Sequence, residues 1–214
     1  MAKIRCTLFS LAMVWAAVFG TGYAHGDEVE NILANGGFED GIANPWTTYG
    51  TATTEVVEEL DKAAVPEDPI EGDFCLHVTV AEKGANFWDS GLQHAGHVFE
   101  KGRKYTLSVF LKCSEDTLQI NFKPELGEDP WPGYGERSFT MTEEWQEFST
   151  TTPVFAEKVV PATITFHIAY TPGDFWVDGV RFYEGDYVAP DFVEPKAVQP
   201  QDKLATVWGK IKAD

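Results

Sequence analysis

Hydrophobic and polar residues alternate along most of this chain, with the period of two that is typical of half-buried strands. Between positions 105 and 111, for example, Leu107, Val109 and Leu111 fall on one side. Similar short segments lie at 31–33, 74–80, 86–94, 118–123, 145–149, 163–170 and 175–183, with Gly, Pro, Asp and Asn between them. A parallel sheet would need helices between its strands, and the residues between these segments show almost no helical period. The pattern predicts an all-β antiparallel sandwich or barrel over residues 29–187.

The first residues do not follow this pattern. Lys3 and Arg5 precede an apolar run from Leu8 to Phe19, and small residues follow at Gly22 and Ala24. We predict that residues 1–24 form a signal peptide, which directs the protein to the extracellular space or the periplasm. A transmembrane anchor is the alternative, but the run is shorter than the roughly 20 apolar residues that span a bilayer. No later stretch is long enough either, so we expect no membrane span.

The C-terminal residues also differ from the body of the chain. Residues 188–202 contain three prolines and little alternation, which predicts an extended linker. Residues 203–214 form a short basic tail, in which Leu204, Trp208 and Ile211 would share one face of a short helix. Two interpretations stay open: the tail attaches the protein to a larger extracellular assembly, or it is a frayed end that lies on the domain.

Charge and aromatic content narrow the range of partners. The chain carries 34 acidic and 16 basic residues, and removal of the first 24 residues leaves a net charge of −20. Such acidity argues against nucleic acid and against anionic membrane surfaces as partners. The 29 aromatic residues exceed what one core of this size needs, so we expect some of them to face a ligand or partner. Cys75 and Cys113 would be either a disulfide or two buried thiols, and their spacing does not decide between these.

Four sequence blocks, taken in order, resemble a known family. The segment 31–41 reads Asn-Ile-Leu-Ala-Asn-Gly-Gly-Phe-Glu-Asp-Gly and is followed by Pro45-Trp46. The other blocks are Gly-Asp-Phe-Cys-Leu-His-Val at 72–78, Gly-Arg-Lys-Tyr-Thr-Leu-Ser at 102–108 and Phe-Trp-Val-Asp-Gly-Val-Arg-Phe at 175–182. Together they resemble the carbohydrate-binding modules of families 4, 9, 16 and 22, with Cys75 and Gly179 replacing a family Ser and Asp. The resemblance implies a galactose-binding-like jelly roll that binds a glycan.

The resemblance also implies a structural calcium ion. Glu39 matches the Glu of the opening motif and Asp178 the first Asp of the closing motif. Backbone carbonyls around Gly72 would complete a site of hard oxygen ligands, which calcium prefers. The alternative is that both carboxylates merely cap turns.

The candidate glycan site follows from the side chains opposite the predicted core positions. Sugar sites need flat aromatic rings and planar polar groups. The alternation predicts that several side chains point away from the core and share one surface. They are Phe110, Lys112, Asn121, Lys123, Thr165 and His167. The segment 86–94 resembles a family strand that offers a stacking aromatic and a Gln. Its candidate glycan-binding residues are Phe87, Trp88, Asp89 and Gln93. The Pro- and Gly-rich loop 129–136 would display Trp131 and Tyr134. An ordinary solvated sheet face and a tryptophan folded over the sandwich edge are the alternatives.

Three classes of function were weighed. A glycosidase needs two carboxylates at a set separation across a cleft, and no Glu-x-Asp-x-x-Glu strand or other catalytic motif occurs. A protein-binding adhesion or scaffold domain would expose a contiguous apolar patch instead of polar cleft residues. The sequence therefore favours a secreted, non-catalytic carbohydrate-binding module. It does not identify the sugar, or whether the protein binds along a glycan chain or at its end.

Overall fold

The computed structural model describes residues 29–58 and 69–191, and within them it has ten strands and no helix. The predicted signal peptide, most of the predicted linker and the basic tail lie outside the described residues. The strands are β1 (Thr47–Tyr49), β2 (Ala52–Glu58), β3 (Phe74–Val80), β4 (Gly91–Phe99), β5 (Tyr105–Cys113), β6 (Leu118–Leu126), β7 (Arg137–Met141), β8 (Gln146–Thr151), β9 (Val159–His167) and β10 (Gly173–Glu184). In this part of the chain, no helix is long and apolar enough to cross a membrane.

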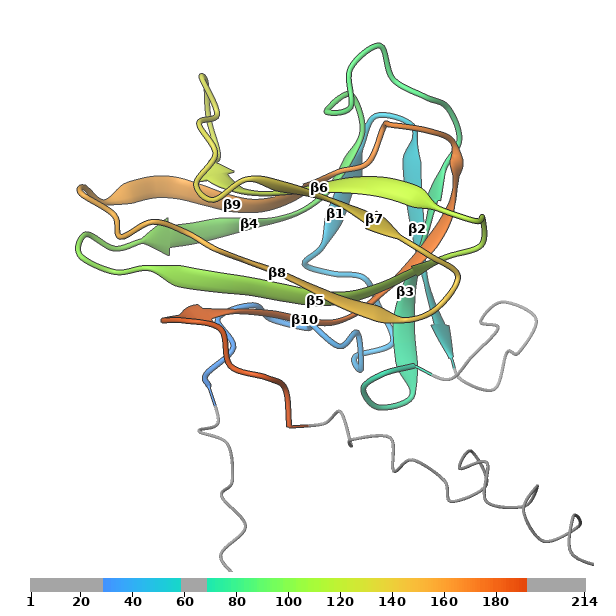
Figure 1. Ribbon diagram of the computed structural model, residues 1–214, viewed down its shortest axis with the longest axis horizontal. Coiled ribbons are helices and arrows are strands. Elements are labelled where there is room, and N and C mark those ends of the chain that lie inside the picture. The colour runs from blue at the N-terminus through green and yellow to red at the C-terminus, as the bar shows by residue number, and fades with distance from the viewer. Residues whose placement is uncertain (1–28, 59–68, 192–214) are drawn as a thin grey trace, which may run out of the picture.

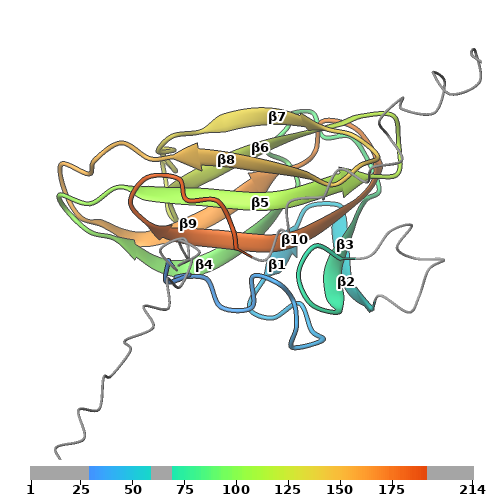
Figure 2. The ribbon, with the colours of Figure 1, turned by 60° about the horizontal axis from the view of Figure 1, so that its bottom comes forward.

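The strands form two five-stranded antiparallel sheets packed face to face (Figures 1 and 2). Sheet A has the order β1-β4-β9-β6-β7, and sheet B has the order β2-β3-β10-β5-β8. Except for β2–β3 and β6–β7, neighbouring strands are not consecutive in sequence, as when β10 lies between β3 and β5. The prediction of an all-β antiparallel sandwich is confirmed.

Most of the expected segments contain strands, but β1, β2 and β7 were not predicted, and two expected segments differ at their ends. The segment 31–33 is irregular rather than a strand, although Ile32 N donates a hydrogen bond to Phe182 O (2.7 Å). The segment 86–90 is a loop, and its strand, β4, begins only at Gly91. Asn86 N donates to Asp89 Oδ2 (2.8 Å), which closes a turn before the strand can start.

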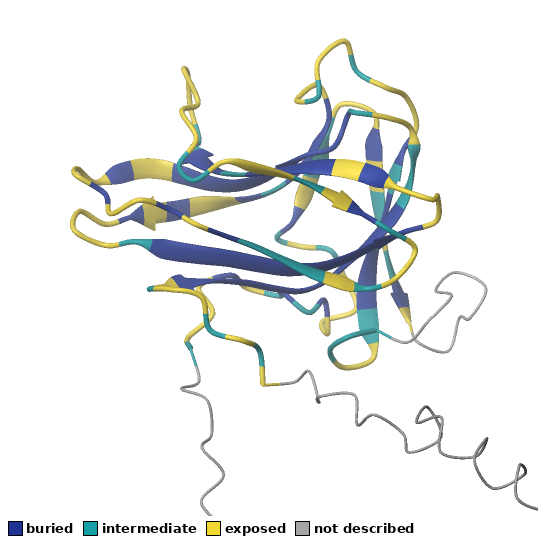
Figure 3. Cartoon of the chain, viewed as in Figure 1, coloured by how far each residue is buried: buried dark blue, intermediate teal, exposed yellow. Residues whose placement is uncertain are grey.

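The core is the layer between the sheets and consists of large apolar side chains from both. Figure 3 shows that the buried residues are concentrated on the strands. Phe122, Phe166 and Phe182 are fully or almost fully buried there. Burial of each such ring stabilises the fold by about 1.5–3 kcal/mol relative to an exposed ring. Cys113 lies in this layer, whereas Cys75 packs with Val57 and Trp176 on the outer face of sheet B. Both cysteines are buried free thiols, so the disulfide alternative is not found.

The N-terminal segment is fastened along β10. Asn31 Nδ2 donates to Val180 O (2.8 Å), and Asn31 Oδ1 accepts from Phe182 N (2.9 Å). A Cβ at Gly36 would lie only 2.1 Å from Val180 O, so glycine is required where the two backbones approach. The opening and closing sequence blocks therefore meet in space and join the two ends of the domain.

Candidate functional site

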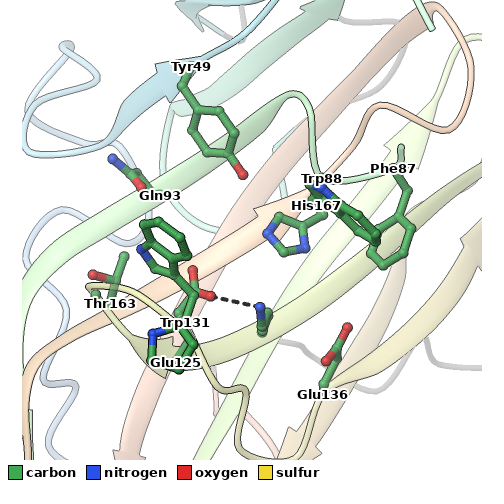
Figure 4. A pocket seen from close by; sticks show the side chains of 12 residues that line it. Tyr49, Phe87, Trp88, Gln93, Glu125, Trp131, Glu136, Thr163 and His167 are labelled. Atoms are coloured by element: carbon green, nitrogen blue, oxygen red, sulfur yellow. Dashed lines mark ion pairs between the residues drawn. The ribbon is translucent and has the colours of Figure 1, made fainter. Parts of the chain in front are cut away.

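A cavity of about 630 Å³ opens on the outer face of sheet A. Two connections rise above this face at opposite ends, the green loop 81–90 and the yellow loop 127–136 (Figure 1). The lining side chains from the strands alternate with core residues, and the others come from the two loops (Figure 4). The lining residues are Tyr49, Phe87, Trp88, Gln93, Lys123, Glu125, Gly127, Pro130, Trp131, Glu136, Thr163 and His167.

Two tryptophans form the exposed part of the wall. Trp88 and Trp131 are each 50% exposed, which is unusual for indole rings in a folded domain. Phe87 packs deeper, stacking on Tyr170 with 5.0 Å between ring centroids and meeting His167 edge-on at 5.7 Å. Of the two neighbouring aromatics, Trp88 therefore presents its ring to solvent, and Phe87 supports the wall.

The loop that carries Trp131 is fixed to β6. Leu126 N donates to Pro132 O (3.1 Å), and Tyr134 N donates to Pro124 O (2.7 Å), so the loop folds back as a short hairpin. Trp131 itself has φ = 49°, a left-handed conformation that is rare for a bulky residue. The surrounding backbone hydrogen bonds fix the part of the loop from which this indole projects.

The floor of the cavity contains a buried ion pair. Lys123 Nζ lies 3.0 Å from Glu125 Oε2, and the two side chains are only 16% and 8% exposed. Thr165 Oγ1 from the neighbouring strand donates a hydrogen bond to Glu125 Oε1. Each oxygen of the carboxylate thus has a partner, as a buried charge requires.

His167 and Tyr49 are both uncharged at neutral pH. Burial, with a smaller effect of Lys123, lowers the pKa of His167 to about 4. Burial raises the pKa of the Tyr49 phenol, and the nearby Glu125 and Asp89 carboxylates raise it further. Both groups therefore offer neutral polar atoms to a ligand. His167 Nδ1 is buried and has no hydrogen-bond partner among the described residues.

Five of the ten predicted binding residues line this cavity: Phe87, Trp88, Gln93, Trp131 and His167. Asn121 pairs with His167 across β6 and β9, but it is buried and donates to Ser138 Oγ (3.1 Å). Asp89 closes the turn before β4. Tyr134 is half-buried against Phe155, with 4.9 Å between ring centroids, and so packs on the sandwich core.

Phe110 and Lys112 lie elsewhere, so the expectation of one shared surface is wrong for them. Both are on β5, which belongs to sheet B, and both are buried on its outer face. Lys112 Nζ lies over the rings of Trp145 and Trp176, at 5.8 and 6.0 Å from their centroids. Alternation along a strand shows which residues avoid the core, but it does not show to which sheet the strand belongs.

The sequence reasoning did not select several residues of the cavity. Glu125 lies beyond residue 123, where the predicted strand ended, whereas β6 continues to Leu126. Tyr49 belongs to a strand of three residues, too short to show alternation. Glu136 and Pro130 stand in the loop that was singled out for its aromatics, and Lys123 and Thr163 fall within the predicted strands. A longer reading of the β6 alternation would have found Glu125.

The carboxylates of the two predicted calcium ligands, Glu39 and Asp178, each accept hydrogen bonds from the backbone of the segment 70–74. Glu39 accepts hydrogen bonds from two successive backbone amides, Asp73 N (3.0 Å) and Phe74 N (3.1 Å). Asp178 accepts from Ile70 N (2.7 Å), Glu71 N (3.0 Å) and Gly179 N (2.7 Å). Among the described residues, no group of three or more His, Cys, Asp or Glu side chains is arranged to hold a metal ion.

The electrostatics of this region are nevertheless unfavourable for bare carboxylates. Burial raises the pKa of Asp178 to about 7, in spite of its three backbone donors. Burial and the Glu39 carboxylate raise the pKa of Glu71. Of these three acidic side chains, Asp178 is buried, Glu71 is half-buried and Glu39 is exposed, and a neighbouring carboxylate raises the pKa of Asp178 and of Glu71.

The comparisons with known proteins agree with this architecture. The family model described as "Carbohydrate binding domain" (CBM_4_9) matches residues 30–171. The chain therefore belongs to this family, and it is a carbohydrate-binding domain. Comparison with the curated proteins gave no match.

Solved structures share the fold at low sequence identity. A CBM4 structure has a TM-score of 0.52 at 19% identity, covering 71% of this chain and 99% of its own. The CBM22-1 xylan-binding domain of Paenibacillus barcinonensis Xyn10C has a TM-score of 0.53 at 14% identity, covering 71% and 93%. A putative sugar binding protein from Bacteroides thetaiotaomicron has a TM-score of 0.55 at 10% identity, covering 73% and 100%. These similarities concern the fold.

Proposed function

We propose that this protein binds a poly- or oligosaccharide in the cavity of sheet A, between Trp88 and Trp131. The observation that carries the proposal is the pairing of two half-exposed indoles with a polar floor. Sugar rings have apolar faces, which stack on aromatic rings, and a rim of hydroxyls, which need polar partners. The six remaining large exposed apolar residues, among the described ones, are spread over other segments (Ile32, Ile42, Val98, Val154, Val160 and Tyr187).

We further propose that binding is not accompanied by hydrolysis. The cavity holds two carboxylates, Glu125 and Glu136. Glu125 is occupied by Lys123 and Thr165, and such engagement keeps it from acting as a general acid or base. The proposal also includes secretion, which rests on the sequence of residues 1–24.

Affinity electrophoresis against β-glucans, xylans, galactans and uronic or sulfated polysaccharides tests the binding. We expect at least one polysaccharide to retard the protein, and none to release reducing sugar during prolonged incubation. If none of the polysaccharides retards the protein, the proposed binding is contradicted. Release of reducing ends would contradict the non-catalytic role.

Calcium is a separate proposal. Glu39, Asp178 and the backbone around Gly72 would hold the ion, which would clip the opening and closing segments together. The convergence of acidic side chains from these segments supports it. Chelator-treated protein should gain thermal stability on addition of calcium, and the Glu39→Gln variant should gain much less. Equal melting temperatures with and without calcium would rule out the proposal.

A further inference from the structure

The cavity contains a positive charge that a carboxylate neutralises. Among the described residues that line it, Lys123 is the only Lys or Arg. Its ammonium group lies 3.0 Å from Glu125 Oε2, and the dashed line in Figure 4 marks this ion pair. Because an unpaired ammonium group would attract an anionic ligand, this partner decides which ligands the cavity accepts.

Glu125 is held in place from three directions. Thr165 Oγ1 on β9 donates to its second oxygen, and its backbone bridges Gly133 in the loop that carries Trp131. The side chain is 8% exposed, so solvent screens the pair less than it would a surface ion pair. A ligand therefore meets a fixed, neutralised pair rather than a mobile lysine.

The other charges around the cavity do not restore a positive potential. Glu136 adds a negative charge at the exposed side of the cavity. Burial and Lys123 keep His167 in its neutral form at neutral pH. With one lysine and two glutamates, the lining has a formal net charge of −1.

We propose that Glu125 is a specificity-determining residue that, by neutralising Lys123, makes the cavity select uncharged glycans over glycans bearing carboxylate or sulfate groups. This inference rests on the proposed function of the cavity. A sugar carboxylate would have to compete with Glu125 for Lys123 and would also approach Glu136. A neutral sugar meets neither penalty, because hydroxyls can donate to Glu125 and accept from Lys123.

The Glu125→Gln variant separates charge from shape. The amide oxygen still accepts the Thr165 hydrogen bond, while the charge of Lys123 is left without its partner. An anionic sugar can then take the place of the lost carboxylate. The double variant K123M/E125Q removes both charges and is the matched control, since it keeps the size of both side chains.

The experiment compares binding of neutral and anionic glycans with the same backbone. Unsubstituted xylan is paired with glucuronoxylan, and cellulose oligosaccharides with their carboxylated forms, and affinities are measured by affinity electrophoresis and calorimetry. We expect the wild type to prefer the neutral member of each pair. E125Q should raise the ratio of anionic to neutral affinity roughly tenfold or more, which corresponds to about 1.4 kcal/mol. K123M/E125Q should return it to near the wild-type ratio.

The outcomes distinguish the two proposals. A folded E125Q with an unchanged ratio, or a wild type that prefers the anionic members, overturns the role of Glu125 while glycan binding stands. A wild type that binds no member of any pair and none of the polysaccharides named under the proposed function overturns the proposed function itself. If E125Q does not fold, Glu136→Gln, an exposed position, should still raise the ratio severalfold, and no change there contradicts the selection by charge.

Discussion

At the scale of single residues, function depends on side chains held in unusual settings. Trp131 combines a half-exposed ring with a left-handed backbone, and backbone hydrogen bonds of the β6 hairpin maintain it. Glu125 carries a buried charge that only its two partners make tolerable. Such local conflicts between propensity and structure are expected at sites of function, because there the fold compensates for them.

The two thiols give a prediction at this scale. Burial, and then the Asp178 carboxylate, raise the pKa of Cys75 to about 12, and burial raises the pKa of Cys113. We expect the native protein, freed of its first 24 residues, to resist labelling by a thiol reagent and to expose two reactive thiols in denaturant without reductant. No reactive thiol after unfolding would show a disulfide, and rapid labelling of the native protein would contradict the burial of Cys75.

Sequence reasoning at this scale succeeded for one sheet and failed for the other. Alternation correctly turned Asn121, His167, Phe110 and Lys112 away from the core. Of the three strands that carry these residues, β6 and β9 border the cavity, whereas β5 pairs with β10 and β8 in sheet B. Sheet membership is set by pairing between strands far apart in the chain, and a pattern within one strand contains no information about it.

At the scale of the elements, irregular backbone holds the domain together and shapes the cavity. β4 departs from regular pairing with β9 between Ala95 and Phe99. There His94 and His97 both turn inward, with His97 Nε2 and His94 Nδ1 2.7 Å apart. Gln93, the residue before this pair, lines the cavity. The period of two predicts regular strands well, but it does not predict such bulges.

This histidine pair predicts a loss of stability in acid. Burial, followed by the His94 charge, lowers the pKa of His97 to about 4, and burial lowers the pKa of His94. The unfolded chain binds protons near pH 6.5 and the folded protein does not, so stability falls as the pH drops from about 6.5 towards 4. The melting temperature should decrease over this range, with a contribution from His167 as well. The raised pKa of Asp178 opposes part of this decrease, because the folded protein takes up that proton at a higher pH than the unfolded chain does.

The variant His97→Gln identifies the source of the effect. It removes one titrating group and keeps a polar side chain that can hydrogen-bond His94. We expect its melting temperature to depend less on pH between 6.5 and 4 than that of the wild type. An equally steep dependence would mean that the histidine pair is not responsible.

Because the N-terminal segment lies so close to β10, we expect that adding one methyl group at Gly36 lowers the stability of the fold. In Gly36→Ala the new Cβ would lie 2.1 Å from Val180 O and would push apart the contact in which Val180 N donates to Gly36 O (2.9 Å). We expect a loss of about 2–3 kcal/mol in the free energy of unfolding, measured by denaturant titration. Gly41→Ala is the control: it has φ = 69° but open space around it, so it should cost only about 1 kcal/mol. Equal losses would contradict the close approach at Gly36.

At the scale of the whole molecule, the sandwich keeps its apolar layer inside and leaves one face of sheet A for recognition. The fold could be predicted because alternation and turn residues extend over the whole domain. About half of the candidate site could be predicted, namely the residues whose aromatic character or position in a short motif made them visible. Lys123 and Glu125 acquire their role only through pairing across the cavity floor, which depends on the three-dimensional arrangement.

The central claim is that a glycan lies between Trp88 and Trp131. Calorimetric titration with an oligosaccharide of the polysaccharide that retards the protein tests it most directly, in the wild type, W88A, W131A and the control Ile42→Ala, which is exposed and outside the cavity. Loss of one stacking ring removes about 1.5–3 kcal/mol of apolar contact. We expect each tryptophan variant to bind roughly ten- to a hundredfold more weakly, with an unchanged melting temperature, and the control to bind as the wild type does. Wild-type affinity in both W88A and W131A would show that the glycan binds elsewhere and would contradict the account.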